Sequence, residues 1–557
     1  MTIKPKAAEA IPEETRELAW KLCPKGTVAM HLRDELGPIY HDEDFLRLYP
    51  KWGQPSYSVW RLALITILQT LEGLTDRQAA QAVEIRVDWR YALSLPLTYR
   101  GLDFTILSDF RERLVSNDAT NVLLQPVLDL CQERGWLKAG GKQRTDSTMV
   151  LARIRTLSSL ESVGEGMRAA LNEIASQDPQ WLLGCVNPEW FDRYVHRFEL
   201  ARFPKEESKR QRLREQVGED VTQLLTLIEQ EETPDPIKLL PQVTMLRRLF
   251  GQHYEIKEGH AHWRAGPAVT NEDRVISPYD QEARSGCKRQ TKWTGYKVHL
   301  SETCDATPEV PRVITNVHTT TATHHDSQAA EKTLEQRREK GVAPAEEYVD
   351  QGYTSGPQLV KQSAQGTEMV GPVPAQGGWQ VHDPTAYSLK DFDLNWQDRE
   401  AHCPQGVQSL KWSRRLDTRG VPVEFIRFPK GTCQQCPVRD QCTTGEQRTI
   451  TLNVQAAHEA LEARRNEQFG PEFQQRYAIR AGIEGTISQA TRAFELRQTP
   501  YMGMAKTHLH HVAIATGLNL MRIHAHLQAQ ALGKPTRPTR SPTPFARLKM
   551  CHEMISA

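Results

Sequence analysis

The segment 477–488 reads Tyr-Ala-Ile-Arg-Ala-Gly-Ile-Glu-Gly-Thr-Ile-Ser and has the pattern of a helix with two different faces. At about 100° per residue, a helix would gather its polar side chains within a sector about 80° wide and its isoleucines in the neighbouring sector. The polar residues are Tyr477, Arg480, Glu484, Ser488 and Thr491. Arg480 would lie one turn from Glu484, where it can steady the acid or hold a phosphate. We therefore expect one face to pack and the other to carry chemistry; the competing interpretation is a solvated face with an incidental ion pair.

Two further acids stand in strand-like settings upstream, Asp146 within 143–152 and Asp350 within 347–353. Taken singly, each would be interpreted as a turn or cap acid, because the chain has 69 Asp and Glu residues and most acids are exposed. Together with Glu484 they form an ordered Asp, Asp, Glu series. Such acids can hold two divalent ions about 3.5 to 4 Å apart, which suits phosphodiester hydrolysis. Mg²⁺ prefers carboxylate oxygens and retains several waters, so a few acids suffice.

On these residues the chain resembles the DDE transposases of bacterial insertion sequences, in the branch marked by Tyr-x2-Arg-x3-Glu. The resemblance extends from about 52 to about 523 and rests mainly on the motifs around Asp146, Asp350 and Glu484. It implies an α/β fold with an RNase H-like catalytic core, in which these three acids bind Mg²⁺ or Mn²⁺. It also implies that Tyr477 and Arg480 contact the DNA end.

The function implied by the resemblance is that of a DNA transposase, which binds transposon ends, cleaves phosphodiester bonds and transfers the strands to target DNA. The expected partners are double-stranded DNA and a second copy of the chain, as a dimer on DNA. Two alternatives stay open: a metal-dependent nuclease without strand transfer, and a catalytically silent, transposon-derived DNA-binding protein. Intact acids at all three positions argue against the silent form.

The chain departs from the resemblance at one position. The branch commonly carries a lysine seven residues beyond the glutamate, where this chain has Thr491 followed by Arg492. Threonine supplies a hydroxyl but no charge, so Arg492 is the expected substitute cation for a DNA phosphate. The alternative is that Arg492 simply covers the helix surface near Glu495.

Composition and local patterns predict several parts along the chain. The segment 54–114 has helix, Gly73 turn and helix spacing, and a further helix places Arg111 outward as a DNA contact. The expected parts are an all-α N-terminal DNA-binding domain over 1–125, an RNase H-like core over 126–155 and 269–400, a mostly helical insertion over 156–268, a cysteine-containing insertion over 401–445, catalytic and C-terminal helices over 446–530, and a basic Pro-rich tail over 531–557. No membrane span or export signal is visible, and a cytoplasmic, nucleoid-associated location is expected.

The net charge of +1 means that attraction to DNA has to come from local patches. One such patch interleaves cations with an aromatic residue: Lys288, Arg289, Lys292 and Trp293. This combination suits phosphate contact and stacking on an unpaired base. The competing interpretation is a basic loop that leads into a strand.

Four cysteines fall close together: Cys403, Cys433, Cys436 and Cys442. A C-x2-C pair with two further thiols can form a tetrahedral structural Zn²⁺ site. Reduced thiols in a loop and an iron–sulfur cluster are the alternatives. A rival, histidine-based metal centre at His508 and His511 is disfavoured, because no acid accompanies these histidines.

Overall fold

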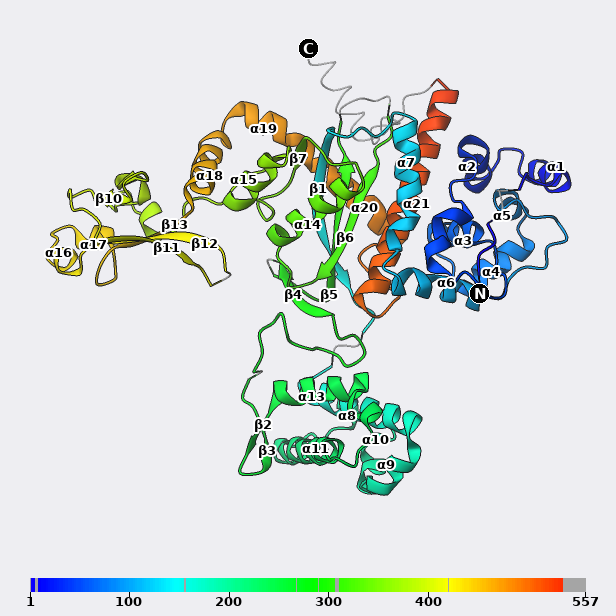
Figure 1. Cartoon of the computed structure of the whole chain (residues 1–557), viewed down its shortest axis with the longest axis horizontal. Helices are drawn as coiled ribbons and strands as arrows, with labels where there is room; N and C mark the ends of the chain where they lie inside the picture. Colours follow the sequence, from blue (N-terminus) through cyan, green and yellow to red (C-terminus); the bar gives the residue numbers. More distant parts are fainter. Residues whose placement is uncertain are drawn as a thin grey trace, which may run out of the picture.

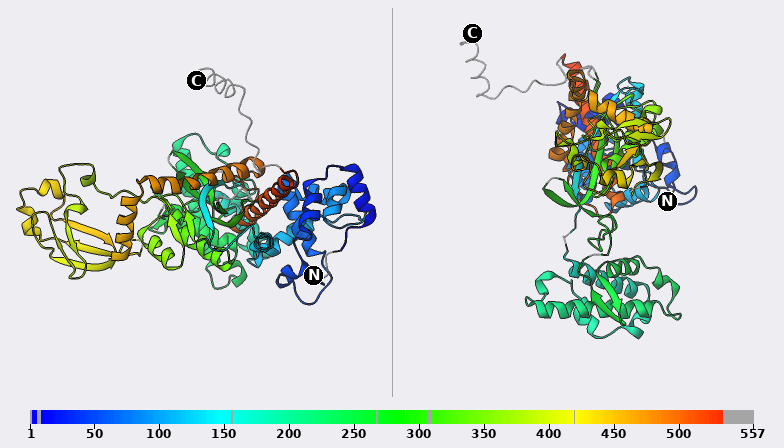
Figure 2. Two further views of the ribbon diagram at one scale, coloured as in Figure 1. Left: turned by 90° about the horizontal axis from the view of Figure 1, so that it is seen from above. Right: turned by 90° about the vertical axis from the view of Figure 1, so that its left-hand side faces the viewer.

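A mixed sheet forms the centre of the molecule, and three parts project from it in different directions (Figure 1; Figure 2). The structure is a computed structural model that describes residues 2–5, 9–154, 157–266, 268–288, 290–305, 310–418 and 420–533. The chain is mixed α/β with a helical N-terminal region, as predicted. Across the described ranges, no helix has the length and apolar character that a membrane span requires.

The central sheet has the strand order β4-β5-β1-β7-β8, and β6 also pairs with β5. Its strands are β1 (Lys142–Leu151), β4 (Arg284–Lys288), β5 (Thr291–Thr303), β6 (Ile314–Thr321), β7 (Glu346–Tyr348) and β8 (Glu368–Val370). β5 is antiparallel to β1, β4 and β6, whereas β7 is parallel to both β1 and β8. β1 is buried along most of its length, as expected for a strand that is covered on both faces.

Helices cover this sheet. They include α14 (Asp326–Glu339), α15 (Gly356–Ala364), α19 (Pro471–Tyr477), α20 (Gly482–Phe494) and the long α21 (Met504–Ala531), while α18 (Gln455–Glu467) packs on α15. The side-chain amide of Asn519 on α21 accepts from the Ile314 N–H at 2.7 Å and donates to the Ile314 carbonyl at 2.9 Å, which fixes α21 to the start of β6.

The N-terminal region consists of α1 (Glu13–Leu22), α2 (Val28–Leu36), α3 (Val59–Glu72), α4 (Asp76–Ile85), α5 (Val87–Ala92), α6 (Thr105–Ser116) and α7 (Gln125–Glu133), with 3-10 turns at Asp42–Leu48 and Thr120–Leu123. Gly73 ends α3 at φ +64°, as the sequence predicted, and Thr75 caps α4 through its side chain. A Cβ on Gly517 of α21 would lie 2.8 Å from Leu71 of α3, so the two helices pack closely. The N-terminal helices and the sheet thus share one hydrophobic core.

A helical lobe follows β1 and has its own hydrophobic core. It contains α8 (Ser159–Gln177), α9 (Pro179–Cys185), α10 (Glu189–Tyr194), a 3-10 turn at Leu200–Arg202, α11 (Glu207–Ile228), α12 (Asp235–Lys238), α13 (Pro241–His253), and the hairpin of β2 (Tyr254–Lys257) and β3 (His260–Trp263). The helical character expected after the Asp146 strand is therefore present.

A smaller strand-rich lobe lies between β8 and α18, at the left of Figure 1. It contains 3-10 turns at Trp379–Val381 and Leu389–Asp391, the short pair β9 (Asp393–Asn395) and β10 (Glu400–His402), the sheet of β11 (Lys411–Leu416), β12 (Pro422–Arg427) and β13 (Thr449–Asn453), and the short helices α16 (Lys430–Gln434) and α17 (Arg439–Cys442).

The segment 477–488 differs in one respect from the uniform helix that its pattern predicts. α19 ends at Tyr477, a 3-10 turn spans Ala478–Ala481, and α20 begins at Gly482. In this turn, the Ile479 carbonyl accepts a hydrogen bond from Arg144 Nη1 of strand β1 at 2.6 Å. Ile483 and Ile487 are buried, so the expected packing face is present.

Candidate active site

The three acids singled out by the sequence meet at one guanidinium group. Arg480 Nη2 lies 2.6 Å from Asp146 Oδ2 and 3.9 Å from Asp350 Oδ2, and its Nη1 lies 3.2 Å from Glu484 Oε1. The expected pairing of Arg480 with Glu484 is present, and two further acids join it. Burial lowers the pKa of Arg480, but the carboxylates, led by Asp146, outweigh burial and raise it.

The sheet brings the two aspartates to the same level. The parallel register of β1 and β7 pairs Arg144 with Tyr348. Asp146 and Asp350 each lie two residues further along the sequence. Asp350 stands just beyond the end of β7, where its Oδ1 accepts from the Gly352 N–H at 2.9 Å. Residues 204 positions apart in the sequence thus present their carboxylates side by side.

A buried charge network holds α20 against the sheet. Glu302 of β5 lies 2.5 Å from the guanidinium of Arg144 and 3.0 Å from that of Arg522, and it accepts from Thr486 at 2.6 Å. Burial raises the pKa of Glu302, but the two guanidinium groups together bring it below its usual value. Gly482 is required at the start of α20, because a Cβ there would lie 2.0 Å from Arg144 Nη1.

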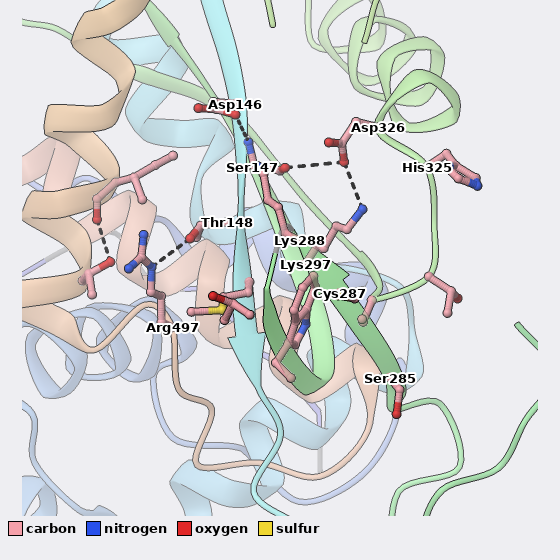
Figure 3. A pocket seen from close by; sticks show the side chains of 18 of the residues that line it. Asp146, Ser147, Thr148, Ser285, Cys287, Lys288, Lys297, His325, Asp326 and Arg497 are labelled. Atoms are coloured by element: carbon pink, nitrogen blue, oxygen red, sulfur yellow. Dashed lines mark hydrogen bonds and ion pairs between the residues drawn. The ribbon is translucent and has the colours of Figure 1, made fainter. Parts of the chain in front are cut away.

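Asp146 and Glu484 both line a cavity of about 1300 Å³. Figure 3 labels Asp146 among the residues that line it. Burial raises the pKa of Asp146 to about 6, with Asp350 acting in the same direction and Arg480 opposing it. The Asp146 side chain is 10% exposed, whereas that of Glu484 is 67% exposed. The site therefore combines one desolvated acid with one that solvent or a substrate can reach.

The donor set is that of a hard divalent cation, since carboxylate oxygens are the ligands that Mg²⁺ and Mn²⁺ prefer. The acids converge on a position that Arg480 now holds. Within the described ranges, no group of three or more His, Cys, Asp or Glu side chains is already arranged to hold a metal ion. Metal binding would thus require Arg480 to release the carboxylates.

Four cations line the cavity that contains these acids. Lys288 and Arg492 were expected from the sequence, and Arg492 also lines a second cavity of about 1020 Å³. Thr491, by contrast, donates its hydroxyl to the Ile487 carbonyl of its own helix at 2.7 Å. Lys292 is exposed beside the cavity, and Arg289 lies outside the described residues.

Sequence reasoning missed three residues of this cavity. Lys297 lies 3.2 Å from Asp326, and Arg497 donates to the Thr148 hydroxyl at 2.8 Å (Figure 3). Asp326 Oδ1 also accepts from the Ser147 hydroxyl at 3.4 Å. Two weak signals were available: Lys297 follows closely after the basic patch at 288–293, and Asp326 is the first residue of α14.

The structure corrects the placement of two expected DNA contacts, Trp293 and Arg111. Trp293 packs over Gly286 and donates Nε1–H to the Tyr296 carbonyl at 3.1 Å, so it is 6% exposed and presents little surface for a base. Arg111 does not face outward, because it pairs with Asp76 at 2.6 Å and its side chain is 12% exposed.

Tyr477 is half-buried and stacks on Phe473 with ring centroids 5.7 Å apart. Burial, as the largest cause, raises its pKa. The ring therefore serves packing beside the acid cluster, in addition to any contact with DNA.

The other candidate ligands lie away from the acids. Cys403, Cys433, Cys436 and Cys442 line a separate cavity of about 330 Å³ in the strand-rich lobe. His508 and His511 share one partner, the Thr319 hydroxyl, at 3.2 and 2.8 Å. These histidines connect α21 to β6, which is a structural use of the imidazoles.

Two family models match the chain. Residues 402–524 match a transposase DDE domain, and residues 25–113 match a transposase domain of the DUF772 family. The first match includes Glu484 and the four clustered cysteines, and the second covers much of the N-terminal helical region. No curated protein and no solved structure matches the chain. Both matches are to transposase domains, and together they support an insertion-sequence DDE transposase.

Proposed function

We propose that this chain is a DNA transposase that cuts phosphodiester bonds at transposon ends and transfers the cut strands to target DNA. One observation carries the proposal: Asp146, Asp350 and Glu484 come from three distant elements and meet at Arg480. The cation-lined cavity beside them supports it, since a nucleic-acid backbone needs both phosphate neutralisation and access to the reacting group.

The sheet is proposed to be an RNase H-like core. In support, β6, β5 and β1 are antiparallel neighbours, and β7 and β8 continue the sheet parallel to β1. The acids stand on the central strand, beyond its parallel neighbour, and on a helix that packs on that strand.

Asp146, Asp350 and Glu484 would hold Mg²⁺ or Mn²⁺ in this scheme. Two such ions supply activation of an oxygen nucleophile and neutralisation of the phosphoryl and leaving oxygens. Arg480 keeps the three carboxylates together before DNA arrives, and its release would free a cation for a phosphate. The Tyr-x2-Arg-x3-Glu signature thus acts at both the acids and the DNA end in this proposal.

The cations of the cavity are proposed to orient the DNA backbone. Arg492 takes the place of the usual lysine, because the Thr491 hydroxyl already donates a hydrogen bond to a carbonyl of its own helix. Lys288 lies across the cavity on β4. The N-terminal helices are proposed to recognise the transposon end, and two ends would be brought together by a dimer of the chain on DNA.

The test uses isosteric variants of the acids in the full chain. Asp146→Asn, Asp350→Asn and Glu484→Gln should each reduce nicking and joining of an end-containing duplex by at least about a hundredfold while leaving duplex binding within about threefold. Glu472→Gln, at an exposed acid on α19, is the matched control and should cut normally.

The products separate the competing functions. Joined product in Mg²⁺ supports a transposase, and nicked product without joining would establish a nuclease instead. Binding without either product in the wild-type chain would establish the silent form. Near-normal cutting by any one acid variant would remove that residue from the site.

A further inference from the structure

The four clustered cysteines of the strand-rich lobe converge on one cavity from separate turns. In the first turn, the Gly406 N–H donates to the Cys403 carbonyl at 2.8 Å, and the Cys403 N–H donates to Val407 at 2.9 Å. In the second, the Cys436 N–H donates to the Cys433 carbonyl at 3.4 Å. Cys442 ends the short helix α17, and all four cysteines line the same cavity of about 330 Å³.

The lobe has little hydrophobic core of its own. Its hydrophobic cluster contains Phe392, Ala401, Ile426, Phe428, Ile450 and Leu452, and Val423 of β12 is buried as well. β9 and β10 are three residues long, and the two helices beside the thiols are a single turn or slightly more. Units of this size usually need a cross-link or a metal to stay folded, because their apolar burial does not offset the chain entropy.

Two guanidinium groups line the same cavity. Arg448 Nη1 donates to the Cys442 carbonyl at 2.9 Å, whereas the buried Nε atoms of Arg439 and Arg448 find no hydrogen-bond partner among the described residues. Buried donors without acceptors are costly, so they indicate a negatively charged group nearby. Four thiolates around one Zn²⁺ carry a net charge of −2, which two guanidinium groups balance.

We propose that Cys403, Cys433, Cys436 and Cys442 bind one structural Zn²⁺, with Arg439 and Arg448 as its counter-charges. On binding, the four thiols release four protons to solvent and form four zinc–sulfur bonds, and nothing is oxidised or reduced. The sulfur atoms are not already in ligand positions, so the ion draws the two turns together around the cavity. A complete four-thiolate set leaves no position for substrate, which makes the site structural.

Metal analysis of the intact chain tests the proposal without any assay of activity. Protein purified under reducing conditions and without added metal should contain about one zinc per chain by mass spectrometry. A mercurial that blocks the thiols should release that zinc to a chromogenic chelator. Absence of zinc, iron with acid-labile sulfide, or a pair of disulfides in freshly prepared protein would each overturn the proposal.

Variants then locate the site. Cys433→Ser and Cys442→Ser should lose the zinc and become at least about tenfold more sensitive to protease within 393–453, whereas Cys185→Ser, in the helical lobe, should keep both zinc and resistance. Arg448→Gln should retain the thiols but lose zinc to a competing chelator about tenfold faster. Zinc that survives in both cysteine variants would show that the metal is held elsewhere and contradict the assignment.

Discussion

At the scale of single residues, Arg480 is the side chain that holds the three carboxylates of the site together. Its guanidinium contacts all three carboxylates, with its own side chain 16% exposed. Three acids with one arginine still leave excess negative charge, and a guanidinium competes with a divalent ion for the same oxygens. In the proposed scheme, Arg480 thus keeps the three carboxylates together and also competes with a metal ion for them until DNA binds.

Replacement of Arg480 should therefore strengthen metal binding while it weakens DNA binding. We expect Arg480→Gln to raise the Mn²⁺ affinity of the DNA-free chain roughly tenfold, equivalent to about 1.4 kcal/mol. Calorimetric titration with Mn²⁺, with and without an end-containing duplex, measures both effects.

Arg492→Gln is the matched control for this measurement. Arg492 lines the same cavity, but its Nε–H donates to the Ser488 carbonyl at 3.3 Å and not to the acids. It should weaken duplex binding and flatten the salt dependence by about one counterion, with no change in Mn²⁺ affinity. Equal Mn²⁺ affinity in wild type and Arg480→Gln would show that the arginine does not compete with metal. If neither the wild type nor any variant bound Mn²⁺ through the three acids, the metal site itself would be contradicted.

At the scale of elements, α20 is positioned by charges that are hidden from solvent. Arg144 and Glu302 are 1% and 0% exposed, and both lie between the sheet and α20. Removing one partner of a buried ion pair typically costs about 3 to 5 kcal/mol, because it leaves the other charge buried and unpaired. The position of Glu484 therefore depends on a buried network whose Arg144 and Glu302 do not line the cavity.

Two glycines of α20 allow a matched test of this dependence. Gly482→Ala should destabilise the chain by about 2 to 4 kcal/mol and reduce cutting, since the new Cβ would overlap the Arg144 guanidinium. Gly485→Ala has open space around it and should be neutral or stabilising by up to about 1 kcal/mol. Denaturant unfolding measures both. A Gly482→Ala chain as stable as Gly485→Ala would mean that Arg144 can move freely.

At the scale of the whole molecule, buried histidines make stability depend on pH. Burial lowers the pKa of His253, His318, His508 and His510 to about 4, and these residues belong to both the helical lobe and the central core. Between pH 6.5 and 4 the unfolded chain takes up protons that the native chain does not. The histidine contribution is therefore fully present above pH 6.5 and is lost as the pH falls towards 4, by at most about 1.4 kcal/mol per pH unit for each histidine.

Comparing wild type with His508→Gln separates the contribution of this histidine from that of all other titrating groups. His508→Gln retains a side chain that can hydrogen-bond Thr319 but cannot be protonated, and it also faces His318 and Lys340. We expect the midpoint of thermal unfolding to fall less steeply from pH 7 to pH 5 in His508→Gln than in wild type. Parallel curves would show that His508 is not held neutral in the native state.

Local sequence determined much of this protein. Apolar periodicity and helix caps specified the strand around Asp146, the helices around Gly73 and the two-faced helix at Glu484, because hydrogen bonds within an element depend on near neighbours. The order of the three acids also predicted a shared metal site, and their chemistry stays a prediction. The spacing of the cysteines specified a shared cluster, since short turns bring the C-x2-C pair together.

Only the tertiary structure decided which partner each side chain meets. In the folded chain, Arg480 contacts the acids, Trp293 packs against Gly286 and Arg111 pairs with Asp76. The fold also places three further residues at the cavity: Lys297, Asp326 and Arg497. These partners lie far along the chain, as with Arg144 and the Ile479 carbonyl, 335 residues apart. Residue type and spacing determine what a side chain can do, whereas the packing of distant elements determines what it does.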